Sequence, residues 1–182
     1  RNVLCRWKVP RSGKYAIRTE AEPSLEPEEF ILKTTVESCR ILSGDIEGVR
    51  RGLYELSGIL SGARAPFLPE GVIRKKFFVK NRVSRCFFGP IHRPPFNIDE
   101  LNHDTDYYPE AFLNRLAREG INVLWLTVEF HEITCSSILP LEPEAPRRLR
   151  KLRRIVEKCR RYGIRVFLFC IEPAGFFGKS EF

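Results

Sequence analysis

The stretch GINVLWLTVE at residues 120–129 decides the fold, because a close copy of it, GIRVFLFCIE, recurs at residues 163–172. In both copies Gly and Ile are followed by a polar residue, Val, a run of mostly large apolar residues and Glu. Each copy follows a segment with helical periodicity, at residues 109–119 and 146–162. The sequence therefore repeats one unit, which consists of a helix, a glycine, a buried strand and a glutamate.

The repeated unit predicts helices that end at glycine and strands that run parallel. Gly120 and Gly163 are placed to end the two helices in the left-handed conformation. Near-continuous apolar strands that follow helices are typical of a parallel sheet covered on both faces. A further strand, RVSRCFFG at residues 82–89, precedes the first helix. The apolar stripes of the two helices are predicted at Phe112, Leu113 and Leu116, and at Leu149, Leu152, Ile155, Val156 and Cys159.

The first part of the chain, residues 1–75, predicts a small α+β domain in which one helix packs on a short sheet. Strand patterns occur at residues 14–19, 30–35 and 38–42, and a helix follows at residues 46–61. Asp45 or Ser43 is the expected N-cap of that helix. The helix residues predicted to face the sheet are Ile46, Val49, Leu53, Leu56 and Leu60. Residues 63–71 have the composition of a linker, and residues 76–182 form the second predicted domain, so the fold class is α/β.

Charge and composition exclude some function classes. The net charge of +8 is uneven, since residues 147–161 carry nine Lys or Arg. An apolar stripe interrupts these cations and no aromatic residue lies among them, so we expect a solvated helix face and no nucleic-acid partner; the alternative is a basic nucleic-acid module. No run of about 18 apolar residues is present, so no membrane span is expected.

The spacing of the six cysteines indicates no zinc knuckle, and two of them are predicted to be free thiols. No CxxC pair occurs, so the spacing typical of a zinc knuckle is absent. Cys86 and Cys170 lie in apolar runs and are predicted to be buried. Free buried thiols favour a reducing compartment such as the cytoplasm, and the sequence says nothing more about localisation.

Acidic and imidazole side chains follow the repeated strands. Glu129 ends the first copy and is followed by His131 and Glu132, and Glu172 ends the second copy. In parallel α/β folds ligands bind at the carboxyl ends of the strands, so these residues are expected to face a ligand. The alternative is that the carboxylates cap helices or pair with arginines. The sequence HEITC, which begins at His131, lacks the second His of a helical zinc motif, so neither a metalloprotease nor a metal is predicted.

A long segment between the first strand and the first helix, residues 89–110, is rich in Pro, Asp, Asn and Tyr. Long loops after barrel strands often carry function. The side chains of Asp104, Asp106, Tyr107 and Tyr108 are suited to bind or stack on a sugar. An ordered surface crossover explains the same composition equally well, and both interpretations stay open.

The order of these parts resembles glycoside hydrolase family 20, whose members carry a small zincin-like α/β domain ahead of a (β/α)8 barrel. The resemblance is carried by EEFILKTTVESCRILSGDIEGVRRGLYELSGIL at residues 28–60, by NRVSRCFF at residues 81–88, and by CIEPAG at residues 170–175. It implies a small zincin-like domain followed by the first βα units of a TIM barrel. It also implies that Arg82 or Arg85, at the first barrel strand, holds a sugar.

Two departures limit what the resemblance carries over. The family's second strand usually ends in a His-, Trp- and Asp-rich turn, whereas this chain has Glu129, Phe130, His131 and Glu132 there. The family's adjacent Asp-Glu catalytic pair follows the fourth barrel strand, and no such strand occurs in this sequence. The catalytic residues are therefore unknown.

We therefore expect a carbohydrate-active glycoside hydrolase of the β-N-acetylhexosaminidase type that acts on a terminal N-acetylhexosamine or a related sugar. The alternative is a non-catalytic carbohydrate-binding protein on the same scaffold, so enzymatic activity is uncertain. The substrate-binding residues are predicted to be Arg82, Arg85, Glu129, His131 and Glu172, with no cofactor and no metal. Because the chain lacks Met and stops after a strand pattern, we expect a fragment of a longer protein, with an incomplete barrel that leaves an apolar face exposed.

Overall fold

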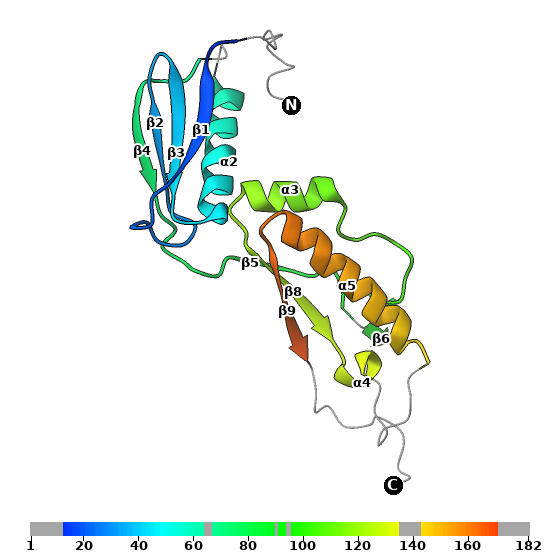
Figure 1. Cartoon of the computed structure of the whole chain (residues 1–182). Coiled ribbons are helices and arrows are strands. Elements are labelled where there is room, and N and C mark those ends of the chain that lie inside the picture. Colours follow the sequence, from blue (N-terminus) through cyan, green and yellow to red (C-terminus); the bar gives the residue numbers. More distant parts are fainter. Residues whose placement is uncertain (1–12, 64–66, 90, 94–95, 135–142, 171–182) are drawn as a thin grey trace, which may run out of the picture. The chain divides into compact units, whose positions relative to one another are not determined.

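The chain divides into two compact units, Arg1–Lys80 and Asn81–Phe182, and each is described by itself. The computed structural model describes residues 13–63, 67–89, 91–93, 96–134 and 143–170. Both units combine helices with strands, so the chain is a mixed α/β protein (Figure 1). Among the described residues, none of the helices combines the length and the apolar character needed to cross a bilayer.

The first unit is a four-stranded sheet with one helix along it (Figure 1). Its elements are β1 (Ala16–Ala21), β2 (Phe30–Thr34), β3 (Ser38–Ser43), α2 (Ile46–Gly62) and β4 (Gly71–Lys75). The strand order is β1-β3-β2-β4, with β1 parallel to β3 and β2 antiparallel to both of its neighbours. The three predicted strands and the helix are confirmed. The prediction missed β4, because a short edge strand with a largely exposed pattern carries little periodic signal.

Helix α2 packs closely on the sheet through glycines. Asp45 is its N-cap, and the Asp45 carboxylate accepts a hydrogen bond of 2.7 Å from the backbone N–H of Gly48. The buried helix residues are Gly48, Arg51, Gly52 and Leu56. The predicted face is therefore partly wrong, since Ile46 is 70% exposed and Leu53 is 45% exposed. A Cβ atom on Gly52 would lie 2.5 Å from Ile41 Cγ2, so the absence of side chains at these glycines lets the helix approach the sheet.

The second unit contains a parallel sheet of three strands in sequence order. Its elements are β5 (Val83–Arg85), β6 (Ile91–Arg93), β7 (Phe96–Ile98), α3 (Glu110–Arg118), β8 (Val123–Val128), α4 (Phe130–Ile133), α5 (Ala145–Arg161) and β9 (Arg165–Cys170). The sheet order is β5-β8-β9, and both strand pairs are parallel. The predicted strand–helix–strand–helix–strand sequence is confirmed. The short antiparallel pair β6–β7 and the one-turn helix α4 were not predicted.

The repeated glycines end both helices in the same way, as predicted. Gly120 has φ +88° and Gly163 has φ +68°, which is the left-handed region. The N–H of Ile121 donates to the carbonyl of Leu116, and the N–H of Ile164 donates to the carbonyl of Cys159, both at 3.0 Å. These are the bonds of a Schellman motif, so the two copies turn from helix into strand by one mechanism.

The parallel sheet is covered less than the sequence predicted. In β8 the side chains of Leu124, Leu126 and Val128 are buried. On the other face Trp125 is 38% exposed, and its ring meets the ring of Phe169 edge to face at 5.1 Å between centroids. Phe169 is itself 48% exposed. The prediction that both faces of the sheet are covered is therefore wrong for the described part of the chain. The exposed apolar face agrees with the separate prediction for an incomplete barrel.

Helix α5 lies alongside β8 and β9 in Figure 1 and contacts β9. Its buried residues are Ala145, Arg148, Leu152, Ile155 and Cys159. The predicted apolar stripe is correct at the last three of these and wrong at Leu149 and Val156, which are about 40% exposed. The thiols also divide, because Cys86 is buried as predicted whereas Cys170 is exposed.

Candidate functional site

The candidate site lies at the carboxyl end of β8, where the chain turns at once into α4. Glu129 directly follows the strand and occupies the N-cap position of α4, with extended backbone angles. The N–H of Glu132 donates to the carbonyl of Glu129 at 3.2 Å. This turn places Glu129, His131 and Glu132 together at one end of the central strand.

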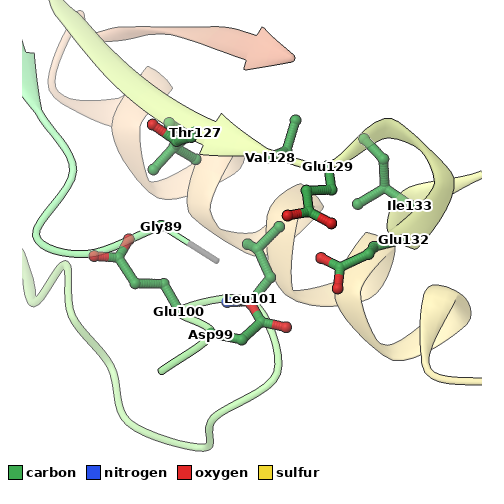
Figure 2. A pocket seen from close by; sticks show the side chains of 10 residues that line it. Gly89, Asp99, Glu100, Leu101, Thr127, Val128, Glu129, Glu132 and Ile133 are labelled. Carbon is green, nitrogen blue, oxygen red and sulfur yellow. Dashed lines mark hydrogen bonds between the residues drawn. The ribbon is translucent and has the colours of Figure 1, made fainter. Parts of the chain in front are cut away.

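A small hollow opens beside these residues (Figure 2). Its lining residues are Gly89, Asp99, Glu100, Leu101, Leu126, Thr127, Val128, Glu129, Glu132 and Ile133. In Figure 2 the carboxylates of Glu129 and Glu132 point to the same space, and the carboxylate of Asp99 lies next to them. The free space is about 10 Å³. That volume holds roughly one water molecule or one ion, and no sugar ring fits inside it.

A buried arginine joins the hollow to helix α5. Arg148 Nε donates to Asp99 Oδ2 at 2.7 Å, and one terminal nitrogen of Arg148 lies 3.5 Å from Glu132 Oε1. All three side chains are at most 11% exposed. The second oxygen of Asp99 accepts the N–H of Leu101 at 2.8 Å. Burying these charges is tolerable because each carboxylate faces the same guanidinium.

Glu100 has a different role, because its two carboxylate oxygens accept hydrogen bonds from one residue before it in the chain and one residue after it. One oxygen accepts the N–H of Phe88 at 2.6 Å, and the other accepts the hydroxyl of Tyr108 at 2.7 Å. Burial raises the pKa of Tyr108 above its usual value, and the bond to the Glu100 carboxylate raises that pKa further. Glu100 therefore fixes the segment around β6 and β7 and is not free to act on a ligand.

Cations of α5 hold the segment that precedes α3. Arg147 bonds Asp104 at 2.9 Å, and Lys158 bonds both oxygens of Asp106 at 2.7 Å. Lys151 donates to two backbone carbonyls of the same segment. The bonds made by Asp104 and Asp106 favour the interpretation of this loop as an ordered crossover. They also correct the view of α5 as a purely solvated basic face.

His131 and Glu129 form the partly exposed edge of the site. His131 Nε2 lies 3.7 Å from Glu129 Oε2, and these side chains are 36% and 26% exposed. One ligand-type atom from each of Glu129, His131 and Glu132 lies within 4.8 Å of the other two. The arrangement therefore combines an imidazole with two carboxylates at one strand end.

The two predicted arginines lie at different places on β5. Arg82 precedes the strand, and its Nε donates to the carbonyl of Gly120 at 2.5 Å. The N–H of Asn122 also bonds the carbonyl of Arg82, so Arg82 lies at the edge where β8 begins, about 20 Å along the strand from Glu129. Arg85 ends β5 beside Trp125 and is exposed. Glu172 lies outside the described residues.

The sequence prediction missed three residues of the site, namely Asp99, Glu100 and Arg148. Asp99 and Glu100 belong to the long segment in which only later acidic residues were singled out. Arg148 lies in a helix with many arginines, and the predicted apolar stripe included the neighbouring Leu149 in its place. A helical wheel centred on Leu152, Ile155 and Cys159 places Arg148 on the same stripe, so this signal was available in the sequence.

No protein-family model and no curated protein matches the chain. Solved structures do match. The chain is similar to a β-N-acetylhexosaminidase from Bacteroides fragilis, with 13% identity, a TM-score of 0.55, and coverage of 88% of this chain and 34% of that one. A family 20 exo-β-N-acetylglucosaminidase from Vibrio harveyi, solved with N-acetylglucosamine, matches at 16% identity and a TM-score of 0.54, over 92% of this chain and 29% of that one.

A family 138 glycoside hydrolase that targets pectin rhamnogalacturonan II gives a higher TM-score of 0.66, at 13% identity, over 93% of this chain and 22% of that one. The chain thus spans about a third or less of the length of these three structures. At such identities the likeness concerns the fold. This chain has a glycoside hydrolase-like fold, and it resembles the matching part of family 20 β-N-acetylhexosaminidase structures.

Proposed function

We propose that this chain forms the small zincin-like domain and the first three barrel strands of a glycoside hydrolase of the hexosaminidase type. The observation that carries the proposal is the order of the two units. A four-stranded sheet with one helix precedes a parallel β-α-β-α-β unit, and about nine-tenths of the chain matches family 20 structures. The substrate would be a terminal N-acetylhexosamine or a related sugar.

The topology of the second unit supports the barrel part of this proposal. Strands β5, β8 and β9 are parallel and neighbours in sequence order. Right-handed crossovers then place α3 and α5 on the same face of the sheet, as a barrel requires. The opposite face carries Trp125, Phe167 and Phe169, each between 38% and 48% exposed. In the proposal this face packs against further strands of the barrel.

The sugar would lie over the carboxyl end of β8. Glu129 and His131 are the partly exposed polar groups there, and a carboxylate accepts hydrogen bonds from sugar hydroxyls. Of the two arginines, Arg85 lies on the face that carries Trp125, whereas Arg82 bonds Gly120 at the opposite edge. We therefore assign the sugar-holding role to Arg85, with Glu172 as the corresponding residue after β9. The catalytic acid is not assigned in this chain.

A non-catalytic carbohydrate-binding protein is the second candidate. The observation that favours it is that Asp99, Glu100 and Glu132, the buried carboxylates of the site, already have structural partners. A general acid needs a carboxyl that is free to donate its proton to the leaving oxygen. Within the described residues only Glu129 among the acids of the hollow is both partly exposed and clear of Arg148.

The test uses the longer gene product that contains this chain and chromogenic N-acetylhexosaminides. We expect turnover, with Glu129→Gln and Arg85→Ala each raising KM or reducing kcat/KM by about tenfold or more, because charged hydrogen bonds to the sugar are lost. Arg153→Ala, an exposed residue of α5, is the control and should leave both constants unchanged. Sugar binding by calorimetry without turnover would select the second candidate. If the protein shows neither sugar binding nor turnover, both candidates are rejected.

A further inference from the structure

We propose that Glu129, His131 and Glu132 form a binding site for a first-row transition-metal dication, with Zn²⁺ as the best fit. The three residues offer one imidazole nitrogen and two carboxylate oxygens at the carboxyl end of β8. This proposal does not depend on the sugar-hydrolase proposal, since it concerns metal binding and no reaction. It also differs from the zinc motif considered in the sequence, because Glu129 takes the place of the missing second His.

The distances between the donor atoms are close to those of a metal site. Zn²⁺ binds nitrogen and oxygen at roughly 2.0–2.2 Å in tetrahedral geometry, so two ligand atoms of one ion lie roughly 3.4 Å apart. His131 Nε2 and Glu129 Oε2 are 3.7 Å apart, and the widest separation among the three donors is within 4.8 Å. Closing the site needs a movement of roughly 1 Å or a little more, which the partly exposed Glu129 and His131 side chains can make toward the buried Glu132.

The space beside the donors has the size of an ion. Glu129 and Glu132 line the hollow, whose free volume of about 10 Å³ is room for roughly one water molecule. In Figure 2 both carboxylates point to that space. This observation is independent of the donor distances, because it depends on how Leu101, Leu126 and Ile133 wall the site. The hollow thus excludes a large ligand and leaves room for a cation.

The charges at the hollow also fit a dication. Asp99, Glu100, Glu129 and Glu132 supply four negative charges at the hollow, and Arg148 supplies one positive charge. The sum is −3 for these five side chains. A carboxylate has two oxygens, so Glu132 can keep Oε1 beside Arg148 and present Oε2 to the metal. A bound dication would then offset two of these three negative charges.

The mixed donor set selects the class of metal. Mg²⁺ and Ca²⁺ prefer oxygen ligands alone and a larger number of them, whereas one imidazole with two carboxylates suits Zn²⁺, Co²⁺ or Mn²⁺. Three protein ligands leave a fourth position for water. We therefore expect tight binding of Zn²⁺ and weak binding of Ca²⁺ and Mg²⁺.

The test is calorimetric titration of the 182-residue chain with Zn²⁺ alone, in a Cys170→Ser background that removes the thiol found exposed among the described residues. We expect one site, and we expect His131→Ala and Glu129→Gln each to weaken it by about tenfold or more. His103→Ala is the matched control, because His103 is exposed and bonds Tyr107 instead of the site. It should leave the affinity unchanged.

Two further measurements keep the result interpretable. The visible spectrum of the Co²⁺-loaded chain should show nitrogen and oxygen ligation, without the charge-transfer band of a thiolate. Circular dichroism of the metal-free variants should match the parent, because Glu129 and His131 are partly exposed. Zn²⁺ binding that survives both substitutions, that shows thiolate ligation, or that is absent from the Cys170→Ser chain would overturn the proposal.

Discussion

Helices α2 and α5 have the same length of 17 residues, and each buries one arginine against its own unit. In the first unit Arg51 bonds a single oxygen of Glu28 at 2.8 and 3.1 Å, and its guanidinium lies 5.7 Å from the ring of Phe77. In the second unit Arg148 lies between Asp99 and Glu132, which line the hollow. Arg51 therefore has a structural role in the first unit, whereas Arg148 forms part of the candidate site in the second.

The difference teaches how each unit holds its helix. In the first unit Gly48 and Gly52 bring α2 onto the sheet, and the apolar core there consists of Phe30, Leu32, Cys39, Ile41 and Leu56. In the second unit α5 also binds the preceding loop through cations. Close apolar packing fixes the first unit, and buried charge contributes more to the second. Four sets of substitutions test this contrast.

The largest effect is expected from Arg148→Ala. It leaves Asp99 and Glu132 buried without their guanidinium, so we expect a loss of about 3–5 kcal/mol in the free energy of unfolding of the second unit. Arg51→Ala should cost less, about 2 kcal/mol, because Glu28 is 14% exposed and gains water more readily. Urea unfolding with hydrogen exchange of α5 and α2 measures both. An equal or smaller loss for Arg148→Ala would contradict the contrast.

The next effect compares two leucines that are register partners in the parallel sheet. Leu126 in β8 is 2% exposed, whereas Leu168 in β9 is 44% exposed. We expect Leu126→Ala to cost about 3 kcal/mol and Leu168→Ala about 1 kcal/mol, because only the first leaves a closed cavity. The same unfolding experiment applies. Similar losses would show that β9 is covered in solution.

A pH effect of intermediate size is expected from Cys159, which is fully buried on α5. Burial raises the pKa of this thiol from 9.0 to about 11. The protonated thiol therefore stabilises the folded state below pH 9, and this contribution is lost as the pH rises from about 9 to about 11. The loss is at most about 3 kcal/mol.

The pH dependence of unfolding, measured for the parent and for Cys159→Ala, isolates this thiol. Other groups that titrate at alkaline pH, including Tyr108, are common to both chains. The parent should therefore lose more stability than the variant between about pH 8 and about pH 11. Parallel curves would show that the thiol is accessible to water.

The smallest effect is expected in the first unit, from Gly48→Ala. A Cβ atom there would lie 2.0 Å from Ser43 Oγ and 2.4 Å from the carbonyl oxygen of Glu29. Overpacking costs about 1–3 kcal/mol and the gain in helix propensity returns about 1, so we expect a net loss of up to about 2 kcal/mol. Gly58→Ala is the matched control, since its Cβ meets open space and should stabilise α2 by up to about 1 kcal/mol. A stabilising Gly48→Ala would refute close packing.

The accuracy of the sequence predictions follows from how local each signal is. The elements α2, α3, α5, β8 and β9 were found within a few residues, because periodicity and capping residues lie inside the segments themselves. The elements β4, β6 and β7 were missed, since each has five residues or fewer and exists only through pairing with a partner strand. The sequence singles out Glu129 and His131 because they follow a recognisable strand, and their sugar-binding role stays a prediction.

The sequence by itself determined the repeated helix–glycine–strand unit, because the left-handed glycine and the apolar run act on their immediate neighbours. Only the tertiary structure decided that Arg148 is buried and that Asp99 and Glu132 meet it. The bond between Arg148 and Asp99 joins residues 49 positions apart. A bond between residues so far apart in the sequence depends on where the segment between β7 and α3 passes α5. No local pattern of residue types predicts that contact.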